Sequence, residues 1–284
     1  MDSIIAGFCQ KVNPRGPGGP MPGKGAPRAE MGLFCLFLCY YMPMEQLIFL
    51  DTETTGNDVN KDRLSQVSYK TADGFYTGYF KPPVPMSVKA MSITNITNKM
   101  LADKESFKGS TMMDDLAARL AKGIMVAHNA KFDAAMLEAE GMSVPRRICT
   151  FRVARELDPE NQIPEYSLQY LRYFLELEVE NATAHDAEGD VKVLYALFLR
   201  LFEKMKKEVG DSEEKALERM MEISARPSLF RLFNFGKYKD KKIAEVARTD
   251  RRYLQWMLDK KMEEGGQDED WIHTLQYYLD GGEA

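Results

Sequence analysis

The stretch FLDTETTG, residues 49–56, decides how the rest of this sequence is interpreted. Its first residues complete the largely apolar run Leu47–Asp51, which predicts a short strand buried in a sheet. Asp51 and Glu53 are two residues apart, so their side chains leave the same face of the strand. Two carboxylates that close repel each other unless a proton or a cation neutralises them. The TTG that follows predicts a turn at the carboxyl end of the strand, where α/β sheets bind ligands, and this favours a catalytic or metal-binding pair over a solvated surface pair.

Strands come first downstream of this stretch, and helices then alternate with strands. We expect strands at Ser65–Thr71, Phe75–Lys81 and Ile124–Ala127, and helices at Asp114–Lys122, Ala130–Glu140, Ser167–Leu175, Asp186–Lys207 and Glu213–Ser224. The ADG at residues 72–74 is a turn signal between two antiparallel strands. Asn129 is expected to cap the helix that it precedes, and Gly141 stands just past the end of that helix. This order of elements indicates an α/β domain with a mixed sheet.

Two further segments carry acidic residues at helix starts. In VAHNAKFDAAML, residues 126–137, Asp133 lies in the first turns of a helix, where an acid also serves simply to complement the helix dipole. In AHDAEGDVKVLYAL, residues 184–197, Asp190 lies near the start of a long helix, five residues after His185. Five residues turn a helix by about 140°, so the two side chains converge only if His185 lies in the preceding loop. The sequence from Thr183 to Asp186 matches a capping box, which would draw His185 into the helix; we favour the loop.

The three acidic segments together resemble the DEDDh group of 3′→5′ exonucleases, at DTETTG, AHNAKFD and HDAEGD. The resemblance narrows to the bacterial exodeoxyribonuclease X family at residues 90–107, 226–258 and 274–279, and it covers about residues 44–280. It implies a ribonuclease H-like fold, with a five-stranded mixed sheet flanked by helices, and a small C-terminal module.

The resemblance also implies a mechanism in which two divalent cations, Mg²⁺ or Mn²⁺, assist phosphodiester hydrolysis, as suits hard carboxylate ligands. Asp51 would bridge both cations, Glu53 and Asp190 would complete one site, and Asp133 would support the other. His185 would take the proton from the attacking water. No catalytic role is expected for His128 or His273.

Substrate contacts are expected on both sides of these residues. The backbone at Thr54 and Thr55 would lie against the 3′-terminal nucleotide. Met91 and Ile93 would stack on the terminal base, with packing in the core as an equally weighted alternative.

The overall charge is mildly acidic, with 38 Lys and Arg against 43 Asp and Glu and a net charge of −5. This argues against nucleic-acid binding by bulk charge and leaves room for a local basic patch. Residues 226–252 form such a stretch, with interleaved aromatic residues that either contact single strands or form a small core. The possible DNA-binding residues in it are Lys237, Lys239, Lys241, Lys242, Arg251 and Arg252.

We expect four parts: an extension at residues 1–43, an exonuclease domain at 44–207, a linker helix at 208–227 and a C-terminal module at 228–284. The extension contains PRGPGGPMPGKGAPR, residues 14–28, which predicts disorder, and an apolar run at Met31–Met44 that is short for a membrane span. An upstream start-site artefact, a flexible tail and an export or membrane signal are all open for it. The four cysteines contain no CxxC pair, which fits a reducing cytoplasm.

The leading functional hypothesis is an exonuclease that degrades DNA from the 3′ end in repair or end processing, as a cytoplasmic protein without a membrane partner. Two rivals keep the chemistry: an RNA-trimming enzyme and the proofreading subunit of a DNA polymerase complex. A third, non-enzymatic rival is a nucleic-acid-binding scaffold built on an exonuclease fold.

Overall fold

The computed structural model describes residues 46–180, 182, 184–265 and 268–283, all within the unit that spans residues 42–284. The expectations for residues 1–43 and for the Thr183 capping box lie outside the described residues. None of the described helices combines the length and the apolar character that a membrane span requires.

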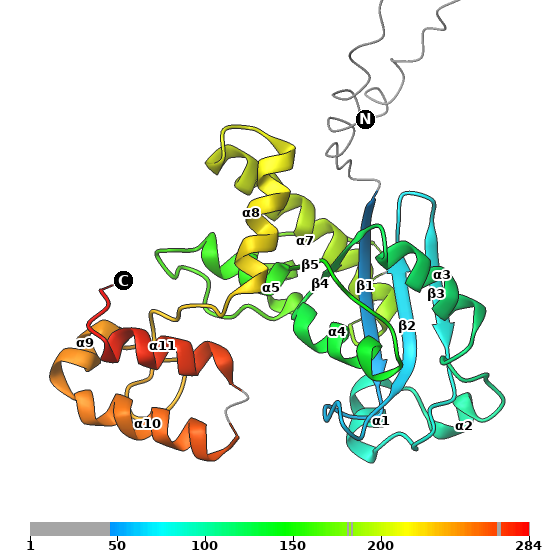
Figure 1. Cartoon of the computed structure of the whole chain (residues 1–284), viewed down its shortest axis with the longest axis horizontal. Helices are drawn as coiled ribbons and strands as arrows, with labels where there is room; N and C mark the ends of the chain where they lie inside the picture. Colours follow the sequence, from blue (N-terminus) through cyan, green and yellow to red (C-terminus); the bar gives the residue numbers. More distant parts are fainter. Residues whose placement is uncertain (1–45, 181, 183, 266–267, 284) are drawn as a thin grey trace, which may run out of the picture. The chain divides into compact units, whose positions relative to one another are not determined.

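The centre of the fold is a five-stranded mixed sheet, as expected (Figure 1). Its strands are β1 (Leu47–Thr54), β2 (Leu64–Lys70), β3 (Phe75–Tyr79), β4 (Ile124–Ala127) and β5 (Arg147–Cys149). They lie in the order β3-β2-β1-β4-β5, with the β1–β2 and β2–β3 pairs antiparallel and the β1–β4 and β4–β5 pairs parallel. The strand that carries FLDTET therefore lies in the middle of the sheet.

Strand β1 is buried on both faces because helices cover both sides of the sheet. Leu47 and Phe49 belong to a core shared with α5 (Thr150–Glu156), α7 (Ala187–Glu208) and α8 (Glu213–Ala225). Ile48 and Leu50 point the other way, into a core shared with α3 (Thr111–Leu120) and α4 (Ala130–Ala139). Successive residues of a strand point to opposite faces, which explains why Leu47 and Phe49 share one core and Ile48 and Leu50 the other. The same alternation places Asp51 and Glu53 on the face that α7 covers.

Two local expectations need correction. Strand β1 continues past Asp51 to Thr54, because Glu53 still pairs with β2, so the turn begins later than expected. Asn129 occupies the N-cap of α4 as expected, but its backbone is left-handed, with φ 65°, and its side chain makes no capping hydrogen bond. The elements β5, α5, α1 (Val88–Thr94) and α2 (Asn98–Leu101), and the three helices after residue 242, were not individually expected. Helix α6 (Leu168–Phe174) agrees with its expected helix.

The helix expected as a linker packs onto the sheet domain. Ala216, Leu217, Met220 and Ile223 of α8 are buried in the same core as Leu47. The assignment of residues 208–227 as a linker stays a prediction, but the helix within it packs against the domain that precedes it.

The C-terminal segment has a core of its own, built from α9 (Ile243–Thr249), α10 (Arg251–Glu263) and α11 (Glu269–Leu279). Phe233 and Trp271 stack at its centre with ring centroids 5.6 Å apart, and Tyr238 and Tyr253 pack against this cluster. Most of the interleaved aromatic residues therefore serve the core, whereas Phe235 is 41% exposed. Arg152 of α5 binds both Glu269 and Asp270 of α11, which ties this segment to the sheet domain.

Candidate active site

Three carboxylates converge at the face of the sheet that α7 covers. Ligand oxygens of Asp51, Glu53 and Asp190 all lie within 4.8 Å of one another. Strand β1 supplies the first two because they alternate to the same face, and α7 supplies the third from its first turn. The tertiary structure therefore joins two of the three acidic segments directly.

Asp133 reaches the same region from the opposite side of β1. It lies on α4, is 3% exposed, and accepts a 2.8 Å hydrogen bond from the Thr52 hydroxyl. Thr52 points away from α7, toward the face covered by α4. Asp133 is not one of the three carboxylates that share the 4.8 Å cluster, but its charge acts on Asp51.

The protonation of these carboxylates reflects burial and crowding. Burial, followed by the charges of Asp133, Asp190 and Glu53, holds the pKa of Asp51 well above its ordinary value. Burial and then the charge of Asp190 raise the pKa of Glu53 to about 8. Burial raises the pKa of Asp133 to about 7, against the opposing effect of the hydrogen bond from Thr52. Burial also raises the pKa of Asp190.

Such a group of acids suits a divalent cation. Repulsion among crowded carboxylates is relieved by protons or by positive charge, and hard oxygen ligands select hard cations. The donor set therefore fits divalent metal binding, with Asp51, Glu53 and Asp190 as the residues best placed to hold an ion.

His185 lies in the loop before α7, as favoured from the sequence. The helix begins at Ala187, with Asp186 at the N-cap, and His185 has a left-handed backbone with φ 60°. Its backbone N–H donates a 3.0 Å hydrogen bond to Oδ2 of Asp190, and its side chain is exposed. The loop and the helix start are thus joined at the carboxylate cluster.

Two glutamines at the site were not predicted from the sequence. Gln169 of α6 donates from Nε2 to Oδ1 of Asp190 over 2.5 Å, and Gln66 of β2 contacts Asp186 and Ala187. Neither residue lies in an acidic segment. Only their position on amphipathic elements that border the site could have pointed to them.

The expected substrate-binding residues lie around the end of β1. Thr54 and Thr55 are buried, and the Thr55 carbonyl accepts a 3.3 Å hydrogen bond from the backbone of Ser87, the N-cap of α1. This bond brings α1, with Met91 and Ile93, next to the end of β1. Met91 packs partly against a small buried cluster, whereas Ile93 is 43% exposed.

His128 and His273 differ in their surroundings. His128 bonds to the Thr150 hydroxyl and the Tyr166 carbonyl, and burial lowers its pKa to about 4, so this imidazole is neutral and engaged in structure. His273 is exposed on α11.

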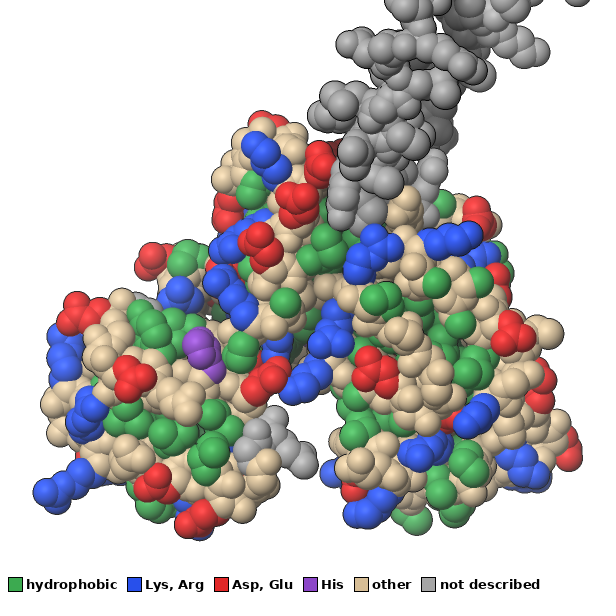
Figure 2. Space-filling view, viewed as in Figure 1, with side chains coloured by type: hydrophobic (Ala, Val, Ile, Leu, Met, Phe, Trp, Pro, Cys, Tyr) green, Lys and Arg blue, Asp and Glu red, His purple; other side chains and the backbone are tan. Residues whose placement is uncertain are grey.

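The six basic residues expected to bind DNA are exposed, and two of these six have partners within the segment. Lys237 pairs with Asp250 over 3.2 Å, and Arg251 binds the Leu279 carbonyl. The visible face of the molecule intersperses Lys and Arg with Asp and Glu (Figure 2). The set of six expected residues is Lys237, Lys239, Lys241, Lys242, Arg251 and Arg252.

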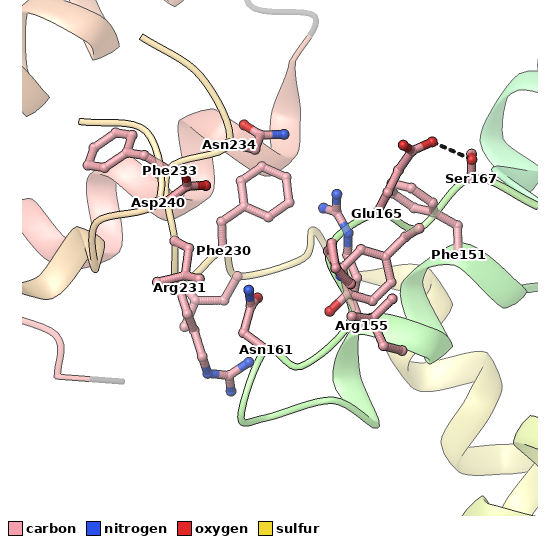
Figure 3. Close-up of a pocket in the computed structure, with 15 residues that line it drawn as sticks. Phe151, Arg155, Asn161, Glu165, Ser167, Phe230, Arg231, Phe233, Asn234 and Asp240 are labelled. Atoms are coloured by element: carbon pink, nitrogen blue, oxygen red, sulfur yellow. Dashed lines mark hydrogen bonds between the residues drawn. The ribbon is translucent and has the colours of Figure 1, made fainter. Parts of the chain in front are cut away.

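A cavity of about 540 Å³ lies between the segment after α5 and residues 229–240 (Figure 3). The Arg155 guanidinium lies over the rings of Phe151 and Phe230, 4.2 and 4.3 Å from their centroids. Its Nε and Nη1 atoms are buried, with no hydrogen-bond partner among the described residues. Acidic Glu165 and Asp240 line the cavity beside the arginines, and none of the five expected catalytic residues does, so this cavity is separate from the carboxylate site.

Comparison with known proteins places these features in context. Residues 48–198 match the RNase T family, described as Exonuclease, and residues 233–261 match the family described as Exodeoxyribonuclease X-like C-terminal. The chain is 30% identical to Exodeoxyribonuclease 10 of Escherichia coli K12, over 75% of this chain and 90% of that protein. It is also 30% identical to DNA polymerase III subunit epsilon of Treponema pallidum, over 56% of this chain and 78% of that protein. A solved structure of exonuclease X in complex with 5′ overhanging duplex DNA is 27% identical, covering 63% of this chain and 99% of that one, with a TM-score of 0.48.

Proposed function

The chain belongs to the exonuclease family, and we propose that it is a metal-dependent 3′→5′ exodeoxyribonuclease that releases mononucleotides. The observation that carries this proposal is the cluster of Asp51, Glu53 and Asp190, whose ligand oxygens lie within 4.8 Å. A non-catalytic scaffold would have no need of three carboxylates held together against their own repulsion.

The carboxylates would hold two Mg²⁺ or Mn²⁺ ions. Asp51 lies on the central strand of the sheet, where burial and then the charges of the neighbouring carboxylates raise its pKa. It is the proposed ligand shared by both cations. Glu53 and Asp190 complete one site, and Asp133 supports the other. Bound cations supply charge neutralisation at the phosphate and help to activate water.

His185 is the proposed general base. Its side chain is exposed in a loop beside Asp190, so it is accessible to a water molecule at the carboxylates. Thr54 and Thr55 would line the position of the 3′-terminal nucleotide, and Met91 and Ile93 would contact its base.

DNA is the proposed substrate because the relatives are named as an exodeoxyribonuclease and as DNA polymerase subunits. Of these relatives, the exodeoxyribonuclease aligns with the larger share of this chain. The match of residues 233–261 to the Exodeoxyribonuclease X-like C-terminal family extends this similarity beyond the catalytic domain. This favours a free-standing DNA-processing enzyme over a polymerase proofreading subunit or an RNA-trimming enzyme. We assign the exposed basic residues of module 228–284 to holding the DNA strand.

The test is a time course on single- and double-stranded DNA and RNA of equal length, labelled at the 5′ or the 3′ end. We expect Mg²⁺-dependent release of mononucleotides from the 3′ end of DNA. Full activity in excess chelator, or release that begins at the 5′ end, would refute the mechanism. A preference for RNA would refute the substrate assignment alone.

A further inference from the structure

A row of three side chains runs across the sheet from the carboxylate site. Glu53 of β1 lies directly opposite Gln66 of β2, and Gln66 lies directly opposite Tyr79 of β3. Residues directly opposite in antiparallel strands share one face, so all three point toward α7. Gln66 is completely buried, and a buried amide needs partners for both its donor and its acceptor.

Gln66 finds both partners at the start of α7. Its Nε2 donates to Oδ1 of Asp186 over 2.8 Å, and its Oε1 accepts from the backbone N–H of Ala187 over 3.4 Å. Tyr79, which pairs with Gln66, lies on the same side. Its hydroxyl is close enough to Asp186 that burial and then the charge of Asp186 raise its pKa. The glutamine thus joins the strand next to Glu53 to the N-cap and the first residue of the helix.

This contact explains an unusual helix start. Asp186 occupies the N-cap, where an aspartate commonly accepts a hydrogen bond from its own helix, yet it makes no such side-chain bond. One of its oxygens instead accepts from Gln66. The Asp186 side chain is therefore bound to Gln66 of the sheet instead of capping its own helix.

The consequence falls on His185, the residue immediately before the N-cap. Its left-handed backbone, with φ 60°, is uncommon for a non-glycine residue and persists only where the surroundings hold it. Three hydrogen bonds flank it: its own N–H donates to Asp190 on one side, and on the other Gln66 donates to Asp186 and accepts from the Ala187 N–H.

We propose that Gln66 is a positioning residue that holds His185 outside α7, by fixing Asp186 and Ala187 to the sheet beside Glu53. The inference rests on the proposed role of His185 as the general base. Without Gln66, the first turn of α7 can shift or extend backward, and the imidazole then loses its place beside the carboxylates. Gln66 itself touches neither the substrate nor the attacking water.

The first test is Gln66→Met, which keeps the length of the side chain and removes both hydrogen bonds. We expect kcat to fall by about 10–100-fold, the usual effect of removing a residue that orients a catalytic group, with little change in KM or in Mn²⁺ affinity. The matched control is Ser110→Ala, since Ser110 is also buried and its hydroxyl accepts a hydrogen bond at the start of α3, away from the carboxylate site. It should keep kcat within about twofold even if it lowers the melting temperature.

The decisive measurement is a double-mutant cycle with His185→Ala. If Gln66 acts through His185, Gln66→Met should lower kcat less than about threefold in the His185→Ala background, because the positioned group is already gone. An equal loss in both backgrounds, or a loss explained by weaker Mn²⁺ binding, would overturn the inference and indicate support of the fold or of the metal ligands.

A second pair of variants covers the case in which Gln66→Met does not fold. Asp186 is only half-buried, and Asp186→Ala removes the acceptor for Gln66, whereas Asp186→Asn keeps an acceptor oxygen and removes the charge. We expect Asp186→Ala to lower kcat in the same His185-dependent way, and Asp186→Asn to restore most of it. Equal effects of the two variants would overturn the inference, since they would show that the charge matters and the hydrogen bond does not.

The controls separate this inference from the proposed function. Mg²⁺-dependent hydrolysis by the wild type, lost in Asp51→Ala, supports the function on its own. If hydrolysis behaves in this way but His185→Ala keeps its kcat, the positioning role fails while the metal-dependent mechanism stands.

Discussion

Oδ2 of Asp190 accepts a 3.0 Å hydrogen bond from the backbone N–H of His185, five residues earlier in the chain. Two side chains at this spacing within one helix would point in different directions. The bond is possible because α7 begins at Ala187 and leaves His185 in the preceding loop. A proposed metal ligand and the proposed base are therefore held together through the backbone.

Asp51→Ala should reduce the rate of DNA hydrolysis more than about a hundredfold, because it removes the proposed shared cation ligand. The measurement is kcat at saturating Mg²⁺. Asp103→Ala, at an exposed carboxylate away from the cluster, is the matched control and should behave as the wild type. Near-normal turnover in Asp51→Ala would remove Asp51 from the mechanism.

His185→Ala should lower kcat by about 10²–10⁴, the usual contribution of a positioned base, while Mn²⁺ affinity and KM change little. Added imidazole should restore part of the lost rate if the missing group is a base. His273→Ala removes an exposed imidazole elsewhere and serves as the control. A variant that retains more than about a tenth of the wild-type kcat would exclude His185 as the base.

The stability of the metal-free protein should respond to Glu53 as pH changes. The pKa of Glu53 is raised from 4.5 to about 8, so the folded state binds its proton more tightly than the unfolded state. This contribution is fully present below pH 4.5 and is lost as pH rises through about 8. Relative to wild type, Glu53→Gln should therefore gain stability between pH 5 and 8.5, as measured by melting temperature in excess chelator. A constant difference between the two proteins across this range would contradict the raised pKa.

Metal binding should release protons from the same cluster. Near pH 7, the raised pKa values of Glu53, about 8, and Asp133, about 7, mean that part of the site is protonated before an ion binds. Calorimetric titration with Mn²⁺ in two buffers of different ionisation enthalpy should show proton release, and the affinity should fall as pH falls. Equal heats in the two buffers would show that these carboxylates are already ionised.

Neutralising exposed lysines of module 228–284 should weaken DNA binding without affecting chemistry. The triple change Lys239→Gln, Lys241→Gln and Lys242→Gln removes three charges from its exposed surface. We expect KM for DNA to rise, its salt dependence to flatten because fewer counterions are released, and kcat to stay within about tenfold.

The matched control for these lysines changes three exposed lysines outside the module to glutamine, at Lys122, Lys207 and Lys215. It loses the same charge and should keep the wild-type KM. If the two triple variants behave alike, the module has no special role in DNA binding and a protein partner becomes the better explanation.

Local sequence patterns predicted most of the secondary structure. Ile124–Ala127 forms β4 as expected, because four consecutive apolar residues at the centre of a sheet are buried on both faces. The hairpin of β2 and β3 follows from its Asp-Gly turn. Strand β5 is only three residues long, Arg147–Cys149, and its pairing depends on β4, so nothing local distinguished it from a loop.

The sequence by itself determined which chemistry is available: alternation on one strand put Asp51 and Glu53 on the same face, and the acidic segments indicated the family. Only the tertiary structure decided which groups meet. The approach of α7 brings Asp190 to the pair on β1, and α4 brings Asp133 to the other side through Thr52. The roles of Gln66 and Gln169 were invisible in the sequence, because a neutral amide carries no periodic or charge signal. The role of each glutamine depends on the carboxylate that folding brings within hydrogen-bonding distance. For Gln66 that carboxylate lies 120 residues away along the chain, and for Gln169 it lies 21 residues away.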